Sequence, residues 1–94
     1  MEDDRNPLAV HLGGTIRMHR RRLGISQEEL ACRTSLHRTE VGLIERGRRE
    51  PRLGTIVKLA GGLEEPLGSL CAGIYWKVEE KTFAFQDRDD ERGK

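Results

Sequence analysis

One short stretch of the chain carries side chains suited to hydrogen bonding with nucleic-acid bases. A helix is predicted at about residues 38–46, and its repeat places Arg38, Thr39 and Leu43 on one face, opposite an apolar stripe. An arginine can donate two hydrogen bonds to guanine, a threonine offers a hydroxyl and a methyl, and a leucine can contact the thymine methyl. We therefore predict that this face contacts bases in double-stranded DNA. The alternatives are contact with phosphate only, or a solvated face.

Basic side chains surround this helix and continue past its end. Such side chains position a protein along the phosphate backbone without reading the base sequence. The predicted phosphate contacts are His37, Arg46, Arg48, Arg49 and Arg52. Their alternative interpretation is a set of exposed side chains without a ligand.

Charge is segregated along the chain, although the net charge of the 94 residues is only +1. Residues 5–58 carry twelve Lys and Arg against five Asp and Glu, a net +7, whereas both ends are acidic. A basic block of this kind favours binding to a polyanion more than the overall charge indicates. Aromatic residues make up 4% of the chain, so the predicted core is aliphatic.

The elements that must position the basic face are predicted to be five short helices. The hydrophobic period begins at Leu8, and further helices follow Ser26, occupy 38–46, start at Leu53 and pass through Leu67. The fold class is therefore all-α, with residues 8–73 as the domain. Residues 1–7 are expected to be a flexible lead, 74–86 a strand-like extension, and 87–94 a disordered charged tail.

Two acidic residues near helix starts have structural interpretations. Ser26 and Glu29 are spaced as a capping box, in which each side chain binds the other residue's backbone N–H. Glu40 lies in the first turn of the helix at 38–46, where a carboxylate offsets the helix dipole. Contact between Glu40 and a cytosine amine is the alternative role.

The residues from Gly24 to Pro51, GISQEELACRTSLHRTEVGLIERGRREP, followed by LGTIVKLAGGL, resemble the Xre family of Cro and phage-repressor helix-turn-helix proteins. The resemblance covers about residues 8–73. The SQEELA start, the small turn, the IERG ending and the following Pro-x-Leu-x-Thr helix all occur in order. The resemblance implies the docking mode of the phage repressors, in which the second helix of the motif enters the major groove.

The resemblance implies further roles for individual residues. Gln27 occupies the position from which family members contact base or phosphate, and we expect a base contact there. Arg20 and Glu45 match a pair that family members often form between the first helix and the reading helix, so a structural ion pair is expected. Proteins of this type usually bind near-palindromic DNA as two-fold dimers, and we expect a homodimer.

The apolar residues of the fifth helix and the extension are many for so small a domain to hide alone. We expect them to form the dimer surface, with a tail folded back on its own core as the alternative. The residues are Leu67, Leu70, Ile74, Tyr75, Trp76, Val78, Phe83 and Phe85.

The function expected from these features is sequence-specific transcriptional regulation, most simply repression, in the cytoplasm. A restriction–modification controller protein is one subtype. The alternative is an antitoxin that binds a toxin protein through its C-terminal region and regulates its own operon. The sequence shows no membrane span, metal-ligand spacing, cofactor motif or nucleophile–base pairing, so no enzyme, metal or cofactor is expected.

Overall fold

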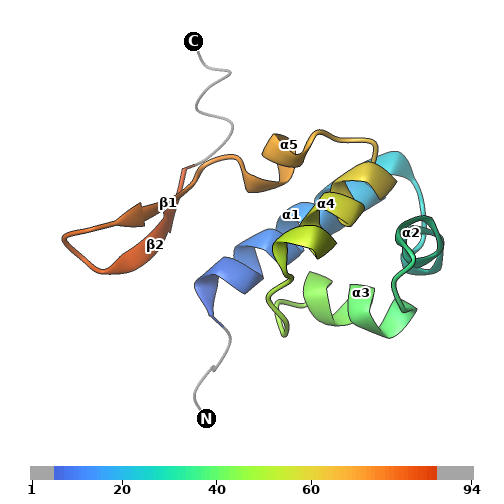
Figure 1. Ribbon diagram of the computed structural model, residues 1–94, viewed down its shortest axis with the longest axis horizontal. Helices are drawn as coiled ribbons and strands as arrows, with labels where there is room; N and C mark the ends of the chain where they lie inside the picture. The colour runs from blue at the N-terminus through green and yellow to red at the C-terminus, as the bar shows by residue number, and fades with distance from the viewer. Residues whose placement is uncertain (1–5, 87–94) are drawn as a thin grey trace.

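The computed structural model describes residues 6–86, which form five helices and one two-stranded antiparallel sheet (Figure 1). The predicted fold class, five helices with a short β-stranded extension, is confirmed. The helices are α1 (Pro7–Leu23), α2 (Gln27–Thr34), α3 (Arg38–Glu45), α4 (Leu53–Gly62) and α5 (Leu67–Cys71), and the strands are β1 (Ile74–Lys77) and β2 (Thr82–Phe85). Most of the lead expected at 1–7 and the whole tail expected at 87–94 lie outside the described residues.

Helix α1 has a capped N-terminus and packs closely against α3. Asn6 caps the helix by accepting a hydrogen bond from the Ala9 N–H, and Pro7 opens it. Gly13 lies against the end of α3, where a Cβ would collide with the backbone carbonyls of Ile44 and Glu45. This glycine weakens α1 as an isolated helix but allows α1 and α3 to approach each other.

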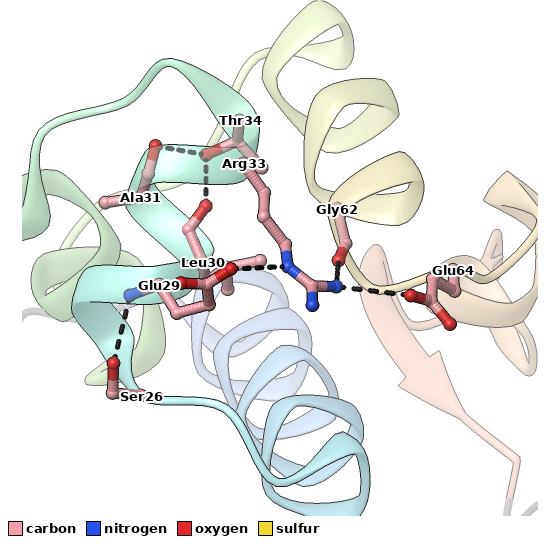
Figure 2. A network of polar contacts seen from close by, with 8 residues as sticks. All are labelled: Ser26, Glu29, Leu30, Ala31, Arg33, Thr34, Gly62 and Glu64. Carbon is pink, nitrogen blue, oxygen red and sulfur yellow. Dashed lines mark hydrogen bonds and ion pairs between the residues drawn. The ribbon is translucent and has the colours of Figure 1, made fainter.

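Only one of the two hydrogen bonds of the predicted capping box forms at the start of helix α2, so the other half of that prediction is wrong. The Ser26 hydroxyl accepts the Glu29 N–H at 3.0 Å, as expected. The Glu29 carboxylate instead accepts a hydrogen bond from Arg33 at 3.1 Å, one turn along the helix. Figure 2 shows why: the Arg33 guanidinium lies between Glu29, the Gly62 carbonyl and Glu64. Arg33 thereby links α2 to the end of α4, and this link competes for the carboxylate.

The core lies where the five helices meet. Helices α1 and α2 both pack on α3, α4 packs on α2 and α5, and α5 packs back on α1. The side chains at the centre are aliphatic, as the composition predicted, and the fully buried ones are Ile16, Leu30, Val41, Ile44, Leu59 and Leu70. Burying each such side chain contributes about 1.5–3 kcal/mol. The apolar faces of the short helices therefore hold one another in place.

The C-terminal hairpin extends away from the helices, on the side opposite α2 and α3 (Figure 1). Ile74 pairs with Phe85 at its base, and Trp76 pairs with Phe83 further out. The Phe85 ring stacks on His11 of α1 at 4.3 Å between ring centroids, which attaches the hairpin to the first helix. The strand-like extension predicted at 74–86 thus forms two strands, and Val78 lies in the turn between them.

Candidate nucleic-acid interface

Helix α3 exposes one face and buries the other. Val41 and Ile44 are completely buried, whereas Arg38 and Thr39 are exposed and Leu43 is half-buried. Leu43 therefore keeps only part of its surface for a thymine methyl. Hydrogen-bonding side chains at the N-terminal end of the helix thus face solvent while its apolar side is held in the core.

Gly42 also belongs to α3, but the space beside it is occupied. It is buried, because the Arg46 guanidinium lies along α3 above it. An added Cβ at Gly42 would be 3.0 Å from an Arg46 nitrogen. The arginine just past the helix end therefore turns back over the exposed face.

A buried ion pair fixes the C-terminal end of α3 to α1. Arg20 Nε lies 2.6 Å from Glu45 Oε2 and Nη2 lies 2.9 Å from Oε1. The two side chains are 12% and 2% exposed. The hydrogen bond to Glu45 raises the pKa of Arg20, against the opposing effect of burial. Such a pair is geometrically specific, because the planar guanidinium meets the carboxylate with two parallel bonds.

Gln27 joins this pair, a contact that the sequence interpretation did not include. Its amide nitrogen donates to Glu45 Oε1 at 3.0 Å. The carboxylate thus accepts three hydrogen bonds from two helices, and the position of α3 is fixed against both α1 and α2. The amide oxygen of Gln27 takes no part in this bond, so the half-buried side chain keeps an acceptor for another partner.

Two long ion pairs join exposed arginines of the basic face to nearby carboxylates. Arg38 Nε lies 3.8 Å from Glu28 Oε2, and Arg49 Nη1 lies 4.0 Å from Glu40 Oε2. Both arginines are exposed, and ion pairs this long at the surface hold side chains weakly. A phosphate or a base can therefore displace either carboxylate at little cost.

The predicted phosphate contacts all lie on the surface around the two ends of α3 and the start of α4. His37 is the N-cap residue of α3 and Arg52 that of α4, and neither side chain caps its helix. Between them the chain exposes Arg46, Arg48 and Arg49. The loop before α4 is anchored from the start of α1, because Asn6 donates to the Glu50 carboxylate at 3.0 Å.

One of the residues predicted for the dimer surface is buried inside the protein. Leu70 is 0% exposed and packs inside the core, because α5 turns its apolar side toward α1 and α4. Ile74 and Phe85 are half-buried at the base of the hairpin. The exposed members are Leu67, Tyr75, Trp76, Val78 and Phe83.

Two further kinds of site were not found among residues 6–86. Within residues 6–86, no three His, Cys, Asp or Glu side chains come together in a way that could hold a metal ion. Over the same range, no helix combines the length and the apolar character needed to cross a bilayer.

Comparison with known proteins finds a family model and a relative that match this chain. A family model described as helix-turn-helix, HTH_3, matches residues 16–70. The Control protein C.SmaI of Serratia marcescens is 37% identical over 69 residues, which span 73% of this chain and 82% of the relative.

Two solved structures are also similar. The restriction-modification controller protein C.AhdI from Aeromonas hydrophila is 40% identical, with a TM-score of 0.65 over 66% of this chain and 94% of its own. The hypothetical transcription factor NHTF from Neisseria is 33% identical, with a TM-score of 0.65 over 74% and 84%. All three relatives are named as regulatory proteins rather than enzymes, in agreement with the expectation of a non-enzyme. The resemblance inferred from the motifs is confirmed, and the chain belongs to the HTH_3 helix-turn-helix family, as a transcriptional regulator.

Proposed function

We propose that this protein binds double-stranded DNA in a sequence-specific manner and regulates transcription by doing so. The observation that carries the proposal is the exposed N-terminal end of α3, with Arg38 and Thr39 outward, on a helix that the Arg20–Glu45 pair holds rigidly. A rigid support matters because base recognition requires the reading side chains at fixed positions.

The proposal divides the surface into reading and positioning residues. Arg38, Thr39, Leu43 and Gln27 contact bases in the major groove, and Arg38 is suited to a guanine. His37, Arg46, Arg48, Arg49 and Arg52 contact phosphates. The weak pairs with Glu28 and Glu40 are exchanged for DNA contacts on binding, since both pairs are long and both arginines are exposed.

Within this class, a restriction–modification controller is the favoured subtype. The supporting observation is that C.SmaI and C.AhdI, at 37% and 40% identity, are both named as controllers. Repression of a promoter by occupying it is the simplest mode of action. A protein that binds the DNA of the cell in this way would act in the cytoplasm. The antitoxin alternative has less support, because none of the three relatives reported above is named as one.

A homodimer is part of the proposal. One reading helix covers about half of a binding site, so a two-fold dimer on a near-palindrome suits the fold. Trp76 and Phe83 form an edge-to-face pair at 5.1 Å and remain 49% and 36% exposed. Aromatic side chains left this open on a small domain indicate a surface that another copy can cover.

Selection from a random pool of duplexes tests the reading and positioning roles. Wild type, Arg38→Ala and Arg49→Ala are compared, and each variant removes one exposed arginine. We expect Arg38→Ala to relax the preference at one base pair in each half-site, at about 1–3 kcal/mol. Arg49→Ala should weaken all duplexes alike. No enrichment by the wild type at low salt would refute the proposed function, and equal effects of the two variants would refute the division of roles.

A further inference from the structure

A polar hollow lies beside the reading helix, between α1, the start of α2 and the end of α3. It has a volume of about 220 Å³ and is lined by Arg17, Arg20, Gln27, Glu45 and Arg46. This volume is several times the roughly 30 Å³ that a water molecule occupies in the liquid. The hollow can therefore hold a group larger than a single water.

The formal charges lining the hollow do not balance. Three arginines and one glutamate line it, which gives a net charge of +2. Arg20 and Glu45 neutralise each other through their paired hydrogen bonds, and Gln27 is neutral. Arg17 and Arg46 carry the other two positive charges of the lining. A surface of this kind attracts an anion that accepts hydrogen bonds from guanidinium groups.

Arg17 lies on the side of α1 that faces α3. It lies four residues after Gly13, which touches the carbonyls at the end of α3, and three before Arg20, which binds Glu45. Residues at these spacings share one side of a helix. Arg17 is exposed, and among residues 6–86 it takes part in no ion pair. Its charge is therefore available to a ligand beside α3.

Arg46 lines the hollow and also lies against the reading face of α3. Arg46 lies along α3 above Gly42, and position 46 is seven residues from Thr39, close to two turns of a helix. Arg46 thus connects the hollow to the side chains proposed to face bases. The cationic surface continues along α1, where a second hollow of about 420 Å³ also includes Arg17, together with Arg21 and Arg22.

We propose that this hollow holds a phosphate of the DNA backbone between Arg17 and Arg46, so that α1 contributes directly to the DNA interface. The inference rests on the proposed function and adds Arg17 to it as a positioning residue. The phosphate lies beside the end of α3, and its position fixes how the helix sits in the groove. Arg17 acts on affinity and leaves base preference unchanged, because phosphates are common to all sequences.

The experiment measures binding of two labelled duplexes of equal length by fluorescence anisotropy from 50 to 200 mM NaCl. One duplex carries a sequence that the wild type selects, and the other carries the same bases shuffled. The variants are Arg17→Gln, Arg17→Lys and, as a control with the same charge change, Lys81→Gln. Lys81 lies in the hairpin turn, away from α3 (Figure 1).

We expect Arg17→Gln to reduce the slope of log affinity against log salt by about 0.9 for each bound subunit. At 0.1 M salt this loss corresponds to about eightfold weaker binding per subunit, equally for both duplexes. Arg17→Lys should keep the wild-type slope, because it keeps the charge. Lys81→Gln should leave the slope unchanged.

Three results would overturn the proposal. The first is an unchanged slope in Arg17→Gln. The second is a loss confined to the selected duplex, which would make Arg17 a base contact. The third is loss of the helical circular dichroism signal in Arg17→Gln, since an exposed phosphate contact is not needed for folding. Failure of the proposed function is seen separately, as a wild type that does not distinguish the two duplexes.

Discussion

Replacing Glu45 with Gln tests whether the buried pair with Arg20 positions α3. The carboxylate accepts bonds at 2.6 and 2.9 Å from Arg20 and at 3.0 Å from Gln27. A Gln side chain has one oxygen and an NH₂ group, so it removes the negative charge and turns a donor toward the guanidinium. Arg20 is then left 12% exposed with no opposite charge beside it.

Breaking a buried pair by removing one partner costs about 3–5 kcal/mol. The lower end applies here, because Arg20 keeps its bond to the Ile25 carbonyl at 2.9 Å and retains slight access to water. A loss of about 3 kcal/mol lowers the Tm of a domain of this size by about 12–24 °C. The expected result for Glu45→Gln is a shift in this range, together with weaker DNA binding.

The assay is thermal and urea unfolding, followed by circular dichroism at 222 nm. Glu29→Gln is the matched control, because Glu29 also pairs with an arginine, but the Glu29 side chain is 50% exposed. An exposed pair contributes little, so the control should unfold close to the wild type. The reasoning is refuted if Glu45→Gln lowers the Tm by no more than Glu29→Gln does.

The remaining predictions concern packing, capping and assembly. Gly13→Ala should destabilise the folded protein by about 1–3 kcal/mol, because the added Cβ collides with the end of α3. Gly14→Ala meets open space and should stabilise the fold by up to about 1 kcal/mol. Urea unfolding measures both variants, and equal effects would contradict the contact between Gly13 and α3. Ser26→Ala should lower the free energy of unfolding by about 1 kcal/mol in the same assay, since the hydroxyl accepts a hydrogen bond from the Glu29 N–H. An unchanged unfolding midpoint would show that this cap does not stabilise the protein. Trp76→Ser should shift the protein toward monomer in sedimentation equilibrium, because Trp76 is 49% exposed; an unchanged mass would exclude this part of the dimer surface.

Much of the fold could be predicted because its signals are local. The apolar period starting at Leu8, the cap at Ser26 and the apolar–polar division of α3 depend only on residue spacing. A strand-like extension at 74–86 was also predicted, and β1 and β2 form there. These patterns act within one or two helical turns or one pair of strands, so they remain visible before any packing is known.

Contacts between distant segments could not be predicted in the same way. The carboxylate of Glu29 turns to Arg33 rather than to the cap, because Arg33 is also held by the end of α4. Leu70 was predicted to face a partner but lies in the core. For both residues, several partners were compatible with the sequence, and the choice depended on helices far away along the chain.

The sequence by itself determined the element types, the aliphatic core and the basic block around α3, because these follow from local spacing and composition. The tertiary structure alone decided that Gly13 is a crossing point, that Gln27 binds Glu45, and that Arg17 and Arg46 line one hollow. The physical reason is that a side chain's partner depends on which helices are brought together and at what angle. That arrangement is set by the packing of the whole core, and no single segment specifies it.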